Sequence, residues 1–225
     1  MKQTQVFRLH CFPESGNSYK VALMLTLCGA HWDPVYVNFF GGETKTAAWR
    51  VAVNEMGEVP VLEKGEIRIA QSAVILGYLA EVLHRFDAHD PAERRELMRW
   101  LFFDNHKFTS YFVTHRFLRA FTRNPDAAVL SFLRSRIDSC FAIVENRLET
   151  NAFILGGLPT IADLSMVGYL YYPKTETGYD FPVSHPNIAR WLERIAALPG
   201  WRPPYEMIPG NRFDPASMDH VERCL

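Results

Sequence analysis

The sequence lacks any apolar run that approaches the ~18–20 residues of a membrane-spanning helix. Its first ten residues, MKQTQVFRLH, also lack the apolar core of a secretory signal peptide. Basic residues form no cluster, and 24 basic and 25 acidic side chains give a formal net charge of −1. Nucleic-acid binding needs a concentrated basic surface. We therefore expect a cytoplasmic protein with no membrane and no nucleic-acid partner.

Cysteine is scarce as well. The four cysteines are widely spaced, with no Cys-x-x-Cys pair, at Cys11, Cys28, Cys140 and Cys224. This spacing fits no common zinc pattern, so we expect no metal. In a reducing compartment the cysteines should be free thiols, and core packing is the expected role of Cys28 and Cys140.

The segments that are present divide into two parts of different character. In the first part, short strand-like and helical segments follow the order βαβ, an intervening helix or loop, then ββα, which favours an α/β sandwich. A polar stretch then contains Pro91 directly after Asp90, a pair typical of a helix start. Beyond it, strand signals nearly vanish and long helical runs follow. We predict an α/β domain over residues 1–84, a linker over 85–91 and an all-helical domain over 92–225.

The stretch CFPESGNSYKV is the first candidate functional segment. Ser15 and Asn17 stand just before a helix whose apolar periodicity begins at Val21. Either residue could simply cap this helix. A helix N-terminus also attracts anions, so the same residues could hold one in place.

Two further segments, GEVPVLE and AQSAVILGYL, could form binding sites. Pro60 lies in a strand-like run, where it cannot donate to a sheet. A cis Val59–Pro60 bond would leave the backbone groups of Val59 free to bind an extended peptide; a plain edge-strand proline is the alternative. Gln71 and Ser72 lie where a strand ends and a helix begins, so Ser72 is either a simple cap or part of a carboxylate site.

Taken together, these segments resemble the glutathione S-transferase family. The likeness covers nearly the whole chain and rests on SGNSYKV, GEVPVLE, QSAVILGYLAE, the linker, and PTIADLSM, whose Thr160 and Asp163 have the spacing of a capping box. The resemblance implies an α/β thioredoxin-like N-terminal domain, an all-α helical-bundle C-terminal domain and a homodimer. It also implies glutathione as the co-substrate of a cytoplasmic detoxification reaction.

The resemblance also implies a role for the residues of each segment. Val59 and Pro60 would pair with the cysteinyl unit of glutathione, and Gln71 and Ser72 would hold its γ-glutamyl carboxylate. Lys45 would approach the glycyl carboxylate, or would be an ordinary surface lysine.

In the resemblance, Ser15 aligns with the serine that activates the thiol in the serine-type classes of the family. Asn17 aligns with an asparagine that lies near the glutathione sulfur in one bacterial class. A free thiol has a pKa of ~8.5, and a hydroxyl donor at hydrogen-bond distance favours the reactive thiolate. Which of the two residues contacts the sulfur stays open. Cys11 lies four residues before Ser15, so a cysteine-type mechanism is not expected.

The second substrate should lie between the domains. Phe12, Phe108, Tyr111 and Phe112 are the expected lining of its pocket, which suggests a small apolar electrophile, although most of them could equally be core residues. Asp104 is a polar member of an apolar stripe on the long helix after the linker. We hypothesise that Asp104 reaches the glutathione amino group, either within one chain or across a dimer. The alternative is that the stripe is exposed to solvent at the cleft or at the dimer interface.

The function expected from the sequence is a serine-type glutathione transferase that activates the glutathione thiol for attack on an apolar electrophile. A glutathione-dependent disulfide or peroxide reductase on the same scaffold is one alternative. A non-catalytic glutathione-binding or protein-interaction module is another, because fold does not fix function.

Overall fold

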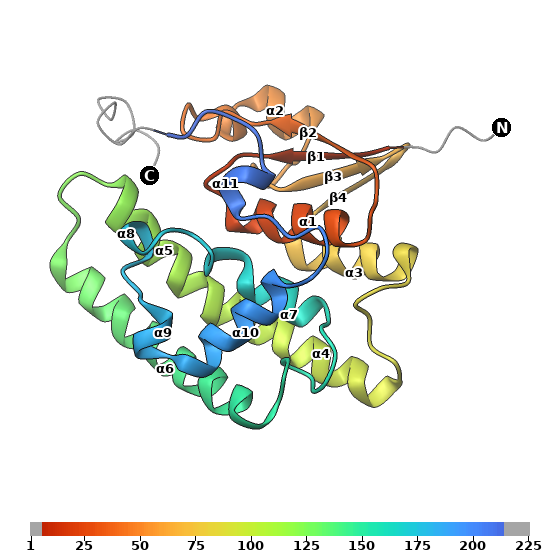
Figure 1. Ribbon diagram of the computed structural model, residues 1–225. Coiled ribbons are helices and arrows are strands. Elements are labelled where there is room, and N and C mark those ends of the chain that lie inside the picture. The colour runs from red at the N-terminus through yellow and green to blue at the C-terminus, as the bar shows by residue number, and fades with distance from the viewer. Residues whose placement is uncertain (1–5, 214–225) are drawn as a thin grey trace.

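The computed structural model describes residues 6–213 of the chain. It has a mixed sheet with helices on both sides, stacked on a bundle of helices (Figure 1). The strands are β1 Phe7–Cys11, β2 Trp32–Tyr36, β3 Val61–Lys64 and β4 Ile67–Ala70. Their order is β2-β1-β3-β4; β1 pairs parallel with β2, and the other pairs are antiparallel. The predicted thioredoxin-like domain is confirmed.

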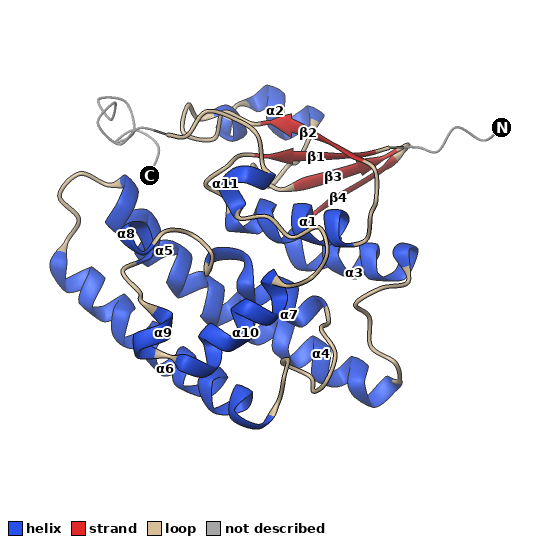
Figure 2. Ribbon diagram, in the orientation of Figure 1, coloured by secondary structure: helices blue, strands red, loops and turns tan. Residues whose placement is uncertain are grey.

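Three helices belong to the sheet layer: α1 Gly16–Leu27, α2 Ala47–Ala52 and α3 Ser72–Leu83. Figure 2 shows α2 on one side of the strands and α1 and α3 together on the other. α1 is the crossover between β1 and β2, because two parallel strands cannot be joined by a tight turn. After α1, Gly29 takes a φ of 64°, a left-handed conformation that glycine adopts without a steric penalty.

The helical layer begins where the sequence predicts. Asp90 accepts hydrogen bonds from the backbone N–H groups of Ala92 (2.7 Å) and Glu93 (2.9 Å), and Pro91 opens the helix. The helices of this layer are α4 Pro91–Phe103, α5 Thr109–Phe121, α6 Ala127–Thr150, α7 Ile161–Met166, α8 Lys174–Thr177, α9 Phe181–Ser184 and α10 Pro186–Ala196; the last helix, α11 Pro204–Met207, packs against α1 (Figure 1). A π-helical segment, Asp104–Phe108, joins α4 to α5.

One hydrophobic core runs through both layers, and α1 lies between the sheet and α7. The predicted capping box at the start of α7 is present, with Thr160 and Asp163 capping each other. Asp163 is fully buried and also accepts hydrogen bonds from the Ile154 backbone (2.8 Å) and the Trp191 indole (2.9 Å). It is therefore a folding element, as the sequence suggested.

Across residues 6–213, no helix is both long enough and apolar enough to span a membrane. Cys11, Cys28 and Cys140 are free thiols, and Cys224 lies outside the described residues.

Candidate active site between the two layers

The N-termini of α1 and α3 meet at one cavity of about 370 Å³. Ser72, the first residue of α3, donates a hydrogen bond from its hydroxyl to the side-chain oxygen of Asn17 (3.3 Å), and both residues line the cavity. Each helix has 12 residues, and its unpaired N–H groups give its N-terminus a partial positive charge. Two such termini at one cavity make it suited to an anionic ligand.

The segment before β3 also lines this cavity. The Val59–Pro60 peptide bond is cis, as predicted, and both residues line the cavity. Val59 lies outside the strand pairing and takes part in no backbone–backbone hydrogen bond within the described chain. Its N–H and C=O groups are thus available to a ligand with an extended peptide backbone.

Gln71 lines the same cavity from the strand-to-helix turn. It has a φ of 68°, a region that residues other than glycine rarely occupy and that is common at functional sites. Its amide nitrogen donates to the Glu58 carboxylate at 2.5 Å. The structure therefore brings together Asn17, Val59, Pro60, Gln71 and Ser72, five of the residues that the sequence singled out.

Ser15 lies in an adjoining, smaller cavity of about 100 Å³. It is 4% exposed and caps α1, where its Oγ accepts the backbone N–H of Ser18 at 3.0 Å. Accepting this bond leaves the Ser15 hydroxyl proton free to be donated elsewhere. Phe39 lines both cavities, so the cavities of Ser15 and Asn17 share a border.

The cavity at Ser15 is mainly aromatic. Phe12 and Phe39 stack with ring centroids 4.6 Å apart, and Phe40 meets Phe12 edge to face at 5.9 Å. The remaining lining residues are Glu14, Val113, Arg116, Phe117, Phe121 and Tyr169. This composition suits a small apolar or aromatic molecule bound next to the Ser15 hydroxyl.

The predicted lining of this pocket is correct only in part. Phe12 lines the cavity, but Phe108 and Phe112 are buried in the helical core against Phe141. Tyr111 packs against the same core. These side chains point into the bundle because they lie on the face of the α4–α5 segment that contacts α6.

Asp104 does not reach the cleft, so the hypothesis that it binds the glutathione amino group is not supported. It is 1% exposed, and its carboxylate accepts hydrogen bonds from Thr109 and Ser165, both at 2.5 Å. The ammonium group of Lys20, in α1, is 3.4 Å away and equally buried. Asp104 therefore joins the two layers. The next residue, Asn105, lines the larger cavity.

Lys45 also lies apart from the site. It ends a short 3-10 helix, Glu43–Lys45, is exposed to solvent, and lines neither cavity.

Cys11 ends β1 close to the site but is fully buried. Burial raises the pKa of its thiol to about 12, and a hydrogen bond from the Val35 backbone offsets this only in part. A thiol with this pKa is inert as a nucleophile near neutral pH, in agreement with the expectation against a cysteine-type mechanism.

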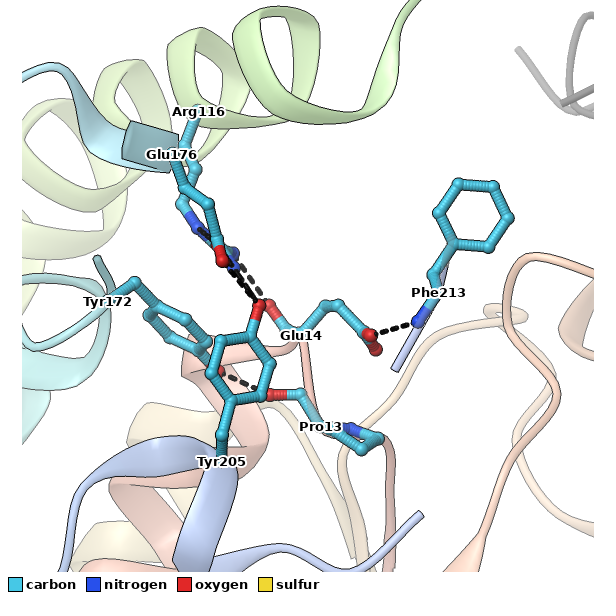
Figure 3. Close-up of polar contacts among 7 residues, drawn as sticks. All are labelled: Pro13, Glu14, Arg116, Tyr172, Glu176, Tyr205 and Phe213. Carbon is cyan, nitrogen blue, oxygen red and sulfur yellow. Dashed lines mark hydrogen bonds and ion pairs between the residues drawn. The ribbon is translucent and has the colours of Figure 1, made fainter. Parts of the chain in front are cut away.

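A buried cluster of the helical layer holds the loop that carries Ser15 (Figure 3). Arg116 donates to the carbonyl oxygen of Glu14 (2.7 Å) and to the Glu176 carboxylate (2.5 Å). Its guanidinium lies 3.7 Å from the ring centroid of Tyr172, whose hydroxyl donates to the carbonyl oxygen of Pro13 at 2.7 Å. Two consecutive carbonyl groups directly before Ser15 are thus fixed by the other layer.

Both layers match known protein families. The family model described as "Glutathione S-transferase, N-terminal domain" matches residues 5–81, and the one described as "Glutathione S-transferase, C-terminal domain" matches residues 105–199.

Individual relatives agree with these matches. Glutathione S-transferase F14 of Arabidopsis thaliana is 27% identical over 207 residues, which cover 86% of this chain and 80% of the relative. Maleylacetoacetate isomerase of Rhizobium meliloti (strain 1021) is 30% identical over 200 residues, 85% of either chain. The crystal structure of a possible glutathione S-transferase from Rhodopseudomonas palustris has a TM-score of 0.81 at 30% identity, covering 89% of this chain and 98% of that one.

Proposed function

The chain belongs to the glutathione S-transferase family, and from this premise we propose that it is a glutathione transferase that activates the glutathione thiol at the border of the two cavities. Glutathione fills the larger cavity, and a small apolar electrophile fills the aromatic cavity at Ser15. The observation that carries the proposal is the meeting of the N-termini of α1 and α3, bridged by Asn17 and Ser72, beside the free backbone groups of Val59.

Two parts of glutathione, the γ-glutamyl carboxylate and the cysteinyl unit, have complementary groups in the larger cavity. The γ-glutamyl carboxylate binds at the N-terminus of α3, where the donors are the amide of Gln71 and the hydroxyl of Ser72, which gives up its bond to Asn17 when the ligand binds. The cysteinyl unit pairs with the N–H and C=O of Val59 in the manner of an added strand. This arrangement directs the sulfur toward Phe39, the border between the two cavities.

Ser15 then favours the thiolate over the thiol. Its free proton forms a charge-assisted hydrogen bond to the sulfur, and the N-terminus of α1 adds a favourable field. A bond of this kind lowers a thiol pKa by about one to two units from ~8.5, so a substantial fraction of bound glutathione is ionised near neutral pH. Asn17, in the larger cavity, orients Ser72 and the cysteinyl unit.

The reaction is a nucleophilic attack by this thiolate. The thiol proton leaves to solvent, and the sulfur forms a bond to the electrophilic carbon; where the carbon carries a halide, the halide departs with its bonding electrons. The aromatic side chains around Ser15 bind the electrophile and exclude water, which strengthens the electrostatic interactions at the sulfur.

The test is a comparison of Ser72→Ala and Ser15→Ala with the wild-type protein. Ser72→Ala should weaken glutathione binding in calorimetry, since it removes a donor to the carboxylate. Ser15→Ala should leave the affinity for glutathione within a few-fold but lower turnover of an activated aryl halide about 10–100-fold at neutral pH, which corresponds to a shift of one to two pKa units. Wild-type protein that neither binds glutathione nor turns over the aryl halide would refute the proposal.

We also propose a homodimer in which the second copy covers an apolar groove between α3 and α4. The groove is a cavity of about 600 Å³ whose exposed apolar residues are Val74, Met98 and Phe102. Gln71 and Asn105 line both this groove and the larger cavity of the active site. A partner chain on this groove would therefore border the glutathione site.

A further inference from the structure

The aromatic cavity at Ser15 is small for the substrate that the proposed function gives it. Its volume is about 100 Å³. Small-molecule pockets commonly have volumes of ~300–1,000 Å³. A second cavity, of about 250 Å³, adjoins it, and Phe12, Glu14 and Phe40 line both. Together the two cavities reach the size of an ordinary small-molecule pocket, so the side chains that divide them decide which electrophiles fit.

The second cavity has one wall from the C-terminal segment, residues 208–213, which follows α11. This segment contributes Asn211, Arg212 and Phe213 to the lining. The remaining lining residues come from the end of β2 and the loop after it: Tyr36, Val37 and Asn38. The second cavity therefore lies where the end of the described chain meets the sheet layer.

Two contacts hold the C-terminal segment against the loop that carries Ser15. The Glu14 carboxylate accepts a hydrogen bond from the backbone N–H of Phe213 at 2.6 Å (Figure 3). A Cβ atom built on Gly210 would lie only 3.0 Å from the Pro13 side chain, so the close approach of the segment depends on glycine there. Since Arg116 fixes the Glu14 carbonyl from the helical layer, Phe213 is tied to a well-held part of the site.

Phe40 separates the two cavities. Its ring stacks with Phe213, with ring centroids 4.0 Å apart, and with Phe117 of α5 at 6.3 Å. It also meets Phe12 edge to face at 5.9 Å. Phe40, Phe117, Phe121 and Phe213 belong to a small apolar cluster that is separate from the main core of the described chain. A ring outside the main core has few neighbours to hold it, and Phe213 is the neighbour with the shortest ring separation.

We propose that the two cavities are parts of one electrophile site, divided by the ring of Phe40, and that Phe213 is a positioning residue that holds Phe40 in this place. This inference rests on the proposed function, because it concerns the electrophile of the same reaction. The site takes a compact aromatic electrophile beside Ser15. An electrophile with a longer apolar chain fits only where Phe40 leaves its stack with Phe213, so Phe213 limits the length of the substrate.

The test uses S-alkylglutathiones, from methyl to octyl, as product analogues whose alkyl chain lies where the electrophile binds. Each methylene group that is buried should raise the affinity about fourfold in calorimetry. In the wild type this gain should end once the chain fills the cavity at Ser15. In Phe213→Ala it should continue for about two or more further carbons. Relative to S-methylglutathione, the longest chains should then bind more than about tenfold tighter to Phe213→Ala than to the wild type.

Phe132→Ala is the matched control. Phe132 lies on α6, is 55% exposed and lines neither cavity, so this variant loses the same ring and should keep the wild-type limit on chain length. An equal extension in Phe132→Ala and Phe213→Ala would contradict the proposal.

A second variant tests the route through Phe40. Phe40→Ala removes the dividing ring itself and should extend the gain to the same chain lengths. Phe40→Ala combined with Phe213→Ala should match Phe40→Ala alone, whereas additive gains would contradict a role of Phe213 through Phe40. A crystal structure of Phe213→Ala with S-octylglutathione should show the chain passing Phe12 and Glu14 into the second cavity, and a chain in any other place would overturn the proposal.

Two further outcomes have different meanings. The same limit on chain length in the wild type, Phe213→Ala and Phe40→Ala, or a wild-type gain that continues undiminished to octyl, overturns the role of Phe213 and leaves the proposed function standing. A wild-type protein that binds neither glutathione nor any S-alkylglutathione overturns the proposed function and this inference together.

Discussion

Replacing Arg116 with methionine should destabilise the protein far more than the same replacement at Arg134. The two arginines make the same kinds of contact. Arg116 pairs with Glu176, donates to the Glu14 carbonyl and lies 3.7 Å from the Tyr172 ring. Arg134 pairs with Asp138, donates to the Gly178 carbonyl and lies 3.7 Å from the Tyr179 ring.

The difference between the two sites is burial. The Arg116 side chain is 2% exposed, whereas that of Arg134 is 41% exposed. Removing one partner of a buried ion pair leaves the other charge uncompensated, at a cost of about 3–5 kcal/mol. Glu176 keeps the Tyr205 hydroxyl at 2.9 Å, so we expect a loss of about 3 kcal/mol for Arg116→Met. For Arg134→Met, water replaces the lost contacts, and the loss should stay under about 1 kcal/mol.

The measurement is urea denaturation of the two variants and the wild type at one protein concentration, followed by far-ultraviolet circular dichroism and by tryptophan fluorescence. Comparing the two probes shows whether both layers unfold in one transition. Equal and small losses of stability at the two positions would refute the claim that the Arg116 cluster holds the Ser15 loop to the helical layer.

Three further predictions concern Glu14, Cys11 and the groove between α3 and α4. Burial raises the pKa of Glu14, so its contribution to stability is present at low pH and is lost as the pH rises through that raised pKa. Glu14→Gln should therefore raise the Tm relative to wild type by an amount that grows as the pH rises above the ordinary carboxyl pKa, and a constant difference would contradict this. Cys11 should resist iodoacetamide in the native protein, because it is fully buried with a pKa of about 12, and should react once the protein is denatured; mass spectrometry of the Cys11 peptide checks both. Phe102→Asp should shift the sedimentation of the protein from dimer toward monomer, since Phe102 is 68% exposed in the groove. Val183→Asp is the control, because Val183 is an 82% exposed residue of α9, and this variant should remain a dimer. Identical sedimentation of the two variants would count against the groove as the interface.

Local signals accounted for much of the fold. The helix starts at Ser15, Asp90 and Thr160 were visible because a cap and its partner lie within three residues of each other. The individual roles expected of Asn17 and Ser72 came from the resemblance, which does not give their contacts.

Long-range contacts account for the errors. Asp104 was expected to reach the glutathione amino group from its place on the apolar stripe. Instead, its carboxylate pairs with the ammonium group of Lys20, which lies 84 positions earlier in the chain. Phe40 lies in a turn after β2, and only the folded chain brings it against Phe117. Tyr169 lines the cavity at Ser15 but gave no sequence signal, because its place depends on close packing against Gly16 of α1. Such pairings depend on packing between segments that no local pattern records.

A crystal structure of the protein with bound glutathione would test the central claim most directly. The account predicts the γ-glutamyl carboxylate at the N-terminus of α3 with Ser72, the cysteinyl backbone paired with Val59, and the sulfur within hydrogen-bond distance of Ser15 Oγ. A sulfur beyond hydrogen-bond distance of Ser15 Oγ would contradict the proposed activation of the thiol.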